Sequence, residues 1–104
     1  MKVIETDEIT YFIGENAQDN HDTFDKMSEN VTWFHLNDTS SAHIFVKLPK
    51  DRKLRKKVVK QAAYYVRYYS KDYGKVCYTG ISNLRKGAEP GEIEISDVIK
   101  LKLI

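Results

Sequence analysis

The sequence predicts an α+β fold, a mostly antiparallel sheet of about five to seven strands packed with one long amphipathic basic helix. Three observations support this prediction. The chain has 104 residues, which suits a single domain over residues 1–104 with one hydrophobic core. Its middle section repeats apolar residues with a helical period, whereas the segments on either side are short β-rich runs. The order of strands, helix and strands favours antiparallel pairing and leaves a parallel element open.

Three β-rich runs precede the helix. Ile9–Gly14 is rich in β-branched and aromatic residues and ends at a Gly-Glu-Asn turn signal. Residues 15–30 are polar and predict a loop or a short irregular helix. Val31–Leu36 and His43–Leu48 are the next two strand candidates, separated by a polar loop. These runs place at least three strands in the first half of the chain.

The alternation within the last two of these strands predicts a shared face. Trp33 and His35 point to one side of the first strand, and His43 and Phe45 point to one side of the second. If the two strands form a hairpin, all four side chains lie on the same face of the sheet.

Residues 51–72 carry the clearest helical pattern, preceded by Pro49, which ends the strand before it. An apolar stripe repeats at spacings of three and four residues and consists of Leu54, Val58, Ala62, Tyr65 and Tyr69. A second stripe is basic and aromatic and consists of Lys53, Lys57, Lys60, Tyr64, Arg67 and Lys71. Gly74 supplies a C-cap signal. We therefore expect a helix with one buried side and one basic side.

The C-terminal part of the chain predicts three more strands, at residues 76–81, 92–95 and 98–104. Between the first two lies the segment Lys-Gly-Ala-Glu-Pro-Gly, residues 86–91. Pro90 and Gly91 favour an ordinary hairpin turn. Gly87 permits close backbone approach, so Arg85 and Lys86 remain candidates for phosphate contacts.

Charge is strongly segregated along the chain, although the formal net charge is only +2. Residues 1–46 contain nine acidic and two basic residues, whereas residues 47–75 contain eleven basic and two acidic ones. Residues 52–60 hold six basic side chains and no acidic one, so their mutual repulsion is uncompensated along the helix. This pattern favours binding of a polyanion, with the acidic first third of the chain as an alternative, intramolecular counterion.

Several classes of protein are disfavoured by composition. Cys77 is the single cysteine, which excludes an internal disulfide framework and a multi-cysteine zinc site. The chain has no apolar run of the ~20 residues that a membrane span requires, and residues 1–10 lack the layout of a signal peptide. We expect a soluble, cytoplasmic protein that needs no cofactor.

An enzyme is also disfavoured. Asp38, Ser40 and His43 are the residue types of a nucleophilic triad, but they crowd into six residues and lack a Gly-x-Ser-x-Gly elbow. A metal site at His35 and His43 would need Asp38 or His21 as a further ligand, and the spacing fits no familiar zinc pattern. The two histidines either pack on the sheet or line a polar binding surface with the neighbouring serines. The sequence leaves both interpretations open.

Three separated motifs together resemble the NFACT-R domain family. They are Trp33-Phe-His35, then Ser40-Ser-Ala-His43, then residues 83–91, and the resemblance covers the chain from about Tyr11 to the C-terminus. This domain is the proposed RNA-binding module of the NFACT proteins, which include the nuclear export mediator factor; a small standalone coiled-coil eukaryotic member has the most similar Ser-Ser-Ala-His segment. The resemblance implies RNA binding in translation or ribosome-associated quality control, without catalysis. The positions that match the family pattern are Trp33, His35, Ser41, His43, Lys86, Pro90 and Gly91.

These observations favour a non-enzymatic domain that binds structured RNA, either tRNA or rRNA, with the large ribosomal subunit as a candidate partner. The expected RNA contacts are Lys53, Arg55, Lys56, Lys57, Lys60, Tyr64, Arg67, Lys71, Arg85, Lys86, His35, Ser40, Ser41 and His43. Trp33, Gly87, Pro90 and Gly91 are expected to shape the fold. Tyr64 and Tyr68 are placed to stack on bases. The alternatives are an adaptor that docks its basic helix on an acidic protein, a DNA-binding module, and a homodimer contact through Tyr64, Tyr68 and Tyr73.

Overall fold

A computed structural model of the chain describes residues 1–27, 30–89, 93–95 and 102–104. Its centre is a six-stranded sheet in which every neighbouring pair is antiparallel. In spatial order the strands are β1 (Lys2–Thr6), β2 (Ile9–Gly14), β4 (His43–Lys47), β3 (Val31–Leu36), β5 (Val76–Gly80) and β8 (Lys102–Leu103). The α+β class predicted from the sequence is confirmed.

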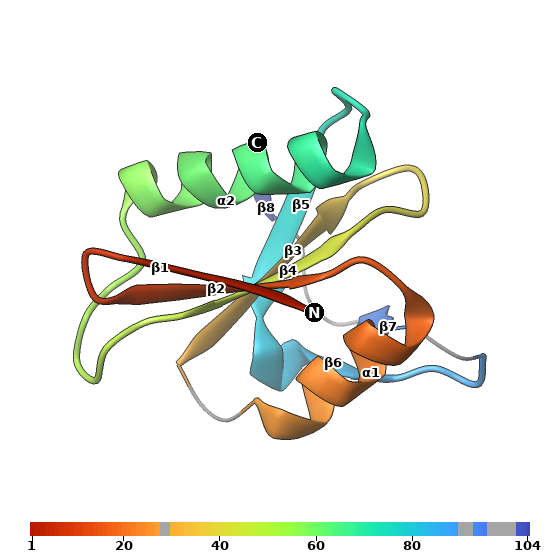
Figure 1. The fold of residues 1–104 in the computed structure, drawn as a ribbon, viewed down its shortest axis with the longest axis horizontal. Helices are drawn as coiled ribbons and strands as arrows, with labels where there is room; N and C mark the ends of the chain where they lie inside the picture. Colours follow the sequence, from red (N-terminus) through yellow and green to blue (C-terminus); the bar gives the residue numbers. More distant parts are fainter. Residues whose placement is uncertain (28–29, 90–92, 96–101) are drawn as a thin grey trace.

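Helix α2 (Lys56–Ser70) covers one face of the sheet (Figure 1). This face is aliphatic and aromatic, and the helix packs its own small apolar residues on it, which lets the two elements approach closely. The strand residues buried here include Ile13, Phe34, Leu36, Ile44, Val46 and Val76, and the helix contributes Val58, Val59, Ala62, Ala63 and Val66.

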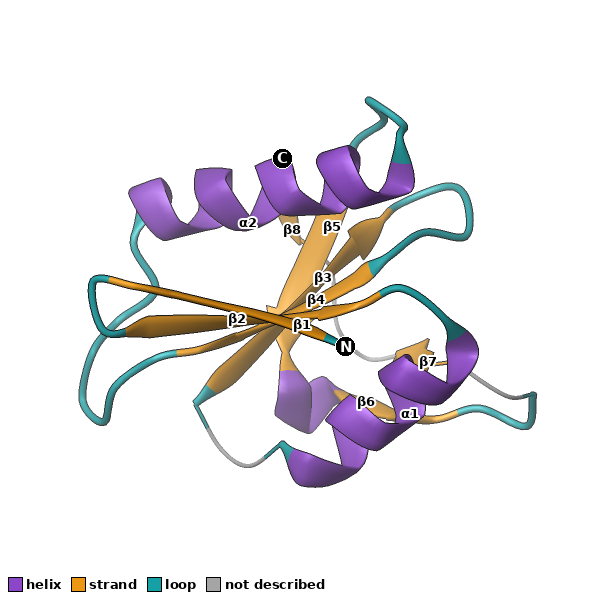
Figure 2. Cartoon of the chain, in the orientation of Figure 1, coloured by secondary structure: helices purple, strands orange, loops and turns teal. Residues whose placement is uncertain are grey.

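The opposite face is covered by helix α1 (Ala17–Lys26) and a separate small sheet of β6 (Leu84–Lys86) and β7 (Ile93–Ile95), as Figure 2 shows. A short 3₁₀ turn, η1 (Ile81–Asn83), connects β5 to β6. The second core cluster consists of Val31, Trp33, Phe45 and Cys77, flanked by Phe12, Phe24, Met27, Ile81, Leu84, Ile93 and Ile95. Because both faces are covered, four of the five residues of β4 are buried.

The N-terminal half of the chain differs from the prediction in three places. β4 ends at Lys47, one residue before the predicted end at Leu48. β2 and β3 have the predicted bounds, but β1 was not predicted. Asp7 and Glu8, which connect β1 to β2, both adopt a left-handed backbone (φ 52° and 69°) without the Asn-Gly or Asp-Gly signal of such turns. Residues 17–26 form a regular helix, where the sequence predicted a loop or a short irregular helix, and the Asn16 side chain caps it by accepting a hydrogen bond from the Asp19 N–H at 2.9 Å.

The basic helix is shorter than predicted at both ends. It begins at Lys56 rather than residue 51, because Asp51 has a left-handed backbone (φ 66°) and Arg55 at the N-cap is extended. Lys53 therefore lies before the helix and not on it. At the other end, Lys71 takes the left-handed C-cap conformation (φ 54°) that was expected further on, at Gly74.

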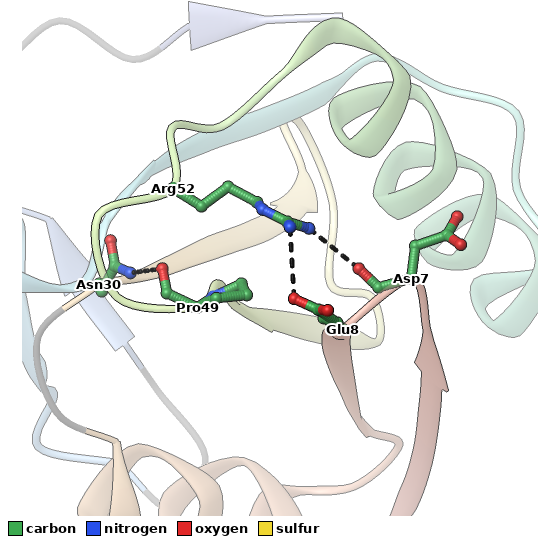
Figure 3. A network of polar contacts seen from close by, with 5 residues as sticks. All are labelled: Asp7, Glu8, Asn30, Pro49 and Arg52. Atoms are coloured by element: carbon green, nitrogen blue, oxygen red, sulfur yellow. Dashed lines mark hydrogen bonds and ion pairs between the residues drawn. The ribbon is translucent and has the colours of Figure 1, made fainter.

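Polar contacts hold the segment before α2 against the β1–β2 turn (Figure 3). Arg52 donates from Nη1 to the Asp7 carbonyl at 3.0 Å and from Nη2 to Glu8 Oε2 at 3.3 Å. Asn30 donates from Nδ2 to the carbonyls of Pro49, at 2.8 Å, and Leu48, at 3.0 Å. These bonds between distant segments fix residues 48–52 outside the helix.

The C-terminal strands follow the prediction only in part. β5 ends at Gly80, because Ile81 begins the 3₁₀ turn, and β7 and β8 fall within the predicted segments at 92–95 and 98–104. Pro90, Gly91, Glu92 and residues 98–101 lie outside the described residues. Among the helices that the structure describes, none combines the length and hydropathy that crossing a membrane requires.

Candidate nucleic-acid interface

Exposed cations gather at the N-terminal end of α2 and on the loop before it. We call this set the basic surface, and it consists of Lys50, Lys53, Arg55, Lys56, Lys57 and Lys60, all exposed. The loop part borders a hollow of about 710 Å³ that Glu8, Pro49 and Asp51 also line. Within the described residues, no member of the basic surface forms an ion pair. These charges are therefore available to an external anion.

The backbone adds to the positive potential of the basic surface. The N-terminus of a helix carries about half a positive charge, and acidic side chains normally accompany it. The first turn of α2 contains no acidic residue, and the N-cap Arg55 makes no side-chain capping bond. Cations at this position cost about 0.3–1 kcal/mol each in helix stability. A bound anion would relieve that cost.

The acidic first third of the chain does little to neutralise the basic segment. Among the described residues, the ion pair that joins the two regions is Arg52 with Glu8. A second acid of this third, Asp25, pairs instead with Lys86, Oδ2 to Nζ at 2.6 Å, next to the small sheet. The intramolecular counterion considered from the sequence thus acts on Arg52 and leaves the basic surface unpaired.

Other cations predicted to contact RNA already have protein partners. Arg67 donates from Nε to the Gly74 carbonyl at 3.0 Å and from Nη2 to the Ile104 carbonyl at 2.8 Å. Arg85 pairs through Nε with Glu94 Oε2 at 2.8 Å. Arg67 therefore ties the end of α2 to Ile104, which follows β8, and Arg85 and Lys86 each pair with a carboxylate on the face of the sheet opposite to α2. Their roles as RNA contacts remain predictions.

The aromatic and histidine side chains of β3 and β4 share one face, as their alternation predicts. The Trp33 indole N–H donates to His43 Nδ1 at 3.3 Å, and the His35 ring stacks on Trp33 with centroids 5.3 Å apart. His35 and His43 meet edge to face at 4.6 Å, and His35 Nδ1 lies 2.6 Å from the Leu36 carbonyl. We call Trp33, His35, His43 and Phe45 the aromatic cluster. It lies on the face of the sheet opposite to α2.

Burial keeps both histidines of the aromatic cluster neutral. Desolvation lowers the pKa of His43 to about 3, helped by the neighbouring His35 and His21. Desolvation also lowers the pKa of His35, although its bond to the Leu36 carbonyl opposes the change. A histidine with a pKa near 3 is a poor general base at neutral pH. Among the described residues, no three His, Cys, Asp or Glu side chains gather as metal ligands would.

The serines of the β3–β4 loop have different surroundings. Ser41 Oγ accepts from the Leu36 N–H at 3.0 Å and donates to the Ala42 carbonyl at 3.0 Å, so it shapes the loop. The Ala42 N–H donates to Ser70 Oγ at 2.9 Å, which ties the loop to the end of α2. Ser40 is exposed.

Two further residues singled out from the sequence lie elsewhere. Lys71 is exposed at the end of α2, and Gly87 is half-buried after β6. The structure thus divides the predicted contacts between the two faces of the sheet. Lys50 belongs to the exposed group and was not predicted as a contact, although it lies in the basic segment of residues 47–75.

Comparisons with known proteins give a family and a fold. The sequence profile of the NFACT protein RNA binding domain matches residues 1–97 of the chain. A search of curated proteins finds no match. The structure of the C-terminal part of the fibronectin/fibrinogen-binding protein from Streptococcus suis superposes with a TM-score of 0.79 at 23% identity. The match covers 98% of this chain and 42% of that one, so the chain spans less than half the length of its structural relative.

Proposed function

Because the chain belongs to the family of the NFACT protein RNA binding domain, we propose that it binds structured RNA, tRNA or rRNA, through its basic surface. We place this activity in translation or ribosome-associated quality control, and therefore in the cytoplasm, with the large ribosomal subunit as a candidate partner. The proposed role is non-enzymatic.

The observation that carries the proposal is the set of unpaired cations around the start of α2. In the described chain, the basic surface collects six exposed basic side chains with no ion-pair partner. Their mutual repulsion and the positive end of the helix dipole make this arrangement unfavourable in the free protein. Phosphates along a nucleic-acid backbone supply the missing negative charge at regular intervals. Binding would then release counterions and depend steeply on salt.

Charge reversal within the basic surface tests the proposal. Lys57→Glu combined with Lys60→Glu should weaken binding to labelled tRNA about 10–100-fold in fluorescence anisotropy at low salt. With five or six phosphate contacts, the wild-type protein should show log affinity falling with log salt at a slope of about −4 to −5, and the double variant, which loses two contacts, should show a slope shallower by about 1.5 to 2. Unchanged affinity of the variant would remove the start of α2 from the binding site.

A matched control comes from the other face of the sheet. Lys26 is exposed in the last turn of α1, and Lys26→Glu changes one charge by the same amount as Lys60→Glu. Single variants at these two positions should therefore differ in RNA affinity while having the same net charge. Equal losses would indicate a general charge effect rather than a site.

The same measurements separate RNA from the other polyanions that fit a basic surface. Duplex DNA and an acidic polypeptide are offered as competitors for labelled tRNA at matched ionic strength. The proposal expects unlabelled tRNA to displace the probe at the lowest concentration. Displacement first by the acidic polypeptide would favour a protein-interaction adaptor, and displacement first by duplex DNA would favour a DNA-binding module.

A further inference from the structure

Three tyrosines are exposed along and just beyond the second half of α2. The side chains of Tyr64, Tyr68 and Tyr73 are 54%, 61% and 92% exposed, whereas aromatic side chains in folded proteins are usually buried for the larger part. The rings of Tyr64 and Tyr68 lie nearly parallel, with centroids 5.9 Å apart and planes at 27°. We call these three residues the tyrosine surface. An exposed tyrosine ring offers a flat face on which any nucleobase can stack, whatever the sequence of the nucleic acid.

The tyrosine surface continues the basic surface along the same side of the helix. At 100° per residue, Lys57, Lys60, Tyr64 and Tyr68 fall within an arc of about 80°, opposite to the buried residues of α2, and Lys71 follows them at the C-cap. Lysines therefore lie before and after the two stacked tyrosines, and all five side chains are exposed. A single strand of nucleic acid that runs along this side of the helix would therefore meet lysines, then the two tyrosines, then another lysine.

A hollow of about 420 Å³ lies at the C-terminal end of this path. Its lining combines aromatic and basic groups, namely Arg67, Tyr68, Tyr69, Lys71 and Tyr73, with Glu15 as the acidic member. The Lys2 ammonium lies 5.4 Å from the centre of the Tyr69 ring, so a further cation stands at this end. Aromatic walls with cations at the rim suit a planar base attached to a phosphate.

From these observations we infer that the tyrosine surface is a nucleobase-stacking platform for an unpaired segment of RNA. Bases of the segment stack on Tyr64, Tyr68 and Tyr73, and its phosphates contact Lys57, Lys60 and Lys71. The inference rests on the proposed function and adds that a single-stranded stretch, not only a folded surface, is recognised. The platform spans about 21 Å of helix from Lys57 to Lys71, which corresponds to about six stacked nucleotides at 3.4 Å each.

Oligouridylates of three, six and nine nucleotides test the platform, because they form no base pairs among themselves and leave their bases free to stack on the tyrosines. Fluorescence anisotropy should show affinity rising from three to six nucleotides and levelling between six and nine. Tyr64→Leu with Tyr68→Leu should weaken binding of the hexamer about 10-fold for each tyrosine that stacks. The salt slope should stay the same, because no cation is lost.

The matched control is Tyr64→Phe with Tyr68→Phe, which keeps both rings and removes both hydroxyls. Near wild-type affinity of this variant supports stacking, whereas a loss equal to that of the leucine variant overturns it. Thermal unfolding of each variant confirms that the fold is intact.

Two further outcomes keep the inference separate from the proposed function. Wild-type affinity of the leucine variant for the hexamer, while Lys57→Glu with Lys60→Glu still weakens tRNA binding, overturns the stacking platform alone. Sedimentation provides the second: a wild-type dimer that the leucine variant converts to monomer, with hexamer affinity unchanged, assigns the tyrosines to self-association and also overturns the inference. If the lysine variant and the leucine variant both bind tRNA with wild-type affinity, the proposed function, RNA binding through the basic surface, is overturned instead.

Discussion

The two faces of the central sheet use the same kinds of residue for opposite purposes. On the outer side of α2, lysines and tyrosines are exposed, and the basic surface has no ion-pair partner among the described residues. On the opposite face, Trp33 and His43 are buried and bonded to each other, and Arg85 and Lys86 pair with carboxylates. The named aromatic and cationic side chains of the second core therefore have partners within the fold, whereas those of the basic surface and the exposed tyrosines of α2 are open to a ligand.

This difference shows that the partner of a side chain, and not its type, separates structure from binding. His43 looks like a ligand-binding residue by type, yet its Nδ1 accepts the Trp33 indole N–H in a buried setting. Lys60 is an ordinary surface residue by type, yet it belongs to a group whose charges are uncompensated in the described chain. Three experiments test this difference between the two faces, and they follow in order of decreasing expected effect.

Truncating one aromatic side chain on each face should have very different consequences. Trp33→Ala should lower the free energy of unfolding by about 3–5 kcal/mol, because it leaves a cavity and removes the donor to His43. Tyr68→Ala should change it by no more than about 0.5 kcal/mol, because that ring is exposed. Urea unfolding at pH 7 measures both. A large loss for Tyr68→Ala would place that ring in the core.

The aromatic cluster should also make the fold sensitive to acid. Burial lowers the pKa of His43 from 6.5 to about 3, so below pH 6.5 the unfolded chain binds a proton that the folded chain does not. The contribution of neutral His43 to the free energy of unfolding is therefore fully present above pH 6.5 and is lost as the pH falls towards 3. Between pH 7.5 and 4.5 the loss should be about 2–3 kcal/mol from His43, and the lowered pKa of His35 acts in the same direction.

Urea unfolding at several pH values measures this loss, and His43→Phe provides the comparison. That variant keeps an aromatic ring and removes the titrating group, so its stability should fall less steeply between pH 7.5 and 4.5. The difference between the two slopes isolates His43 from the carboxylates. Parallel slopes would show that His43 is protonated at no cost in the folded state.

The smallest effects are expected at the paired cations of the second face. Arg85→Gln and Lys86→Gln should each lower the free energy of unfolding by less than about 1 kcal/mol, because both ion pairs are near the surface. Each should also leave tRNA affinity within about twofold of wild type, since these charges already have partners. An RNA affinity reduced as far as in the Lys57→Glu, Lys60→Glu variant would extend the binding surface around the sheet to its second face.

Local patterns were sufficient for most of the secondary structure. The strands at Ile9–Gly14 and Val31–Leu36 were predicted with correct bounds, because their apolar runs are flanked by polar turn residues. The side-by-side placement of Trp33, His35, His43 and Phe45 followed from a period of two in paired strands. The elements that were missed lack such signals. β1 is mostly exposed, and its turn to β2 uses Asp7 and Glu8 where glycine or asparagine is usual.

The sequence by itself determined the fold class, the family resemblance and the concentration of charge between residues 47 and 75. Tertiary structure decided where α2 begins, because Arg52 and Asn30 hold the preceding loop through bonds to segments far away in the chain. It also decided which cations are free. Arg67 and Lys86 find partners 37 and 61 positions away in the chain, and sequence spacing does not encode contacts at such separations. Charge is a local property of the chain, whereas its neutralisation depends on which distant segments the fold brings together.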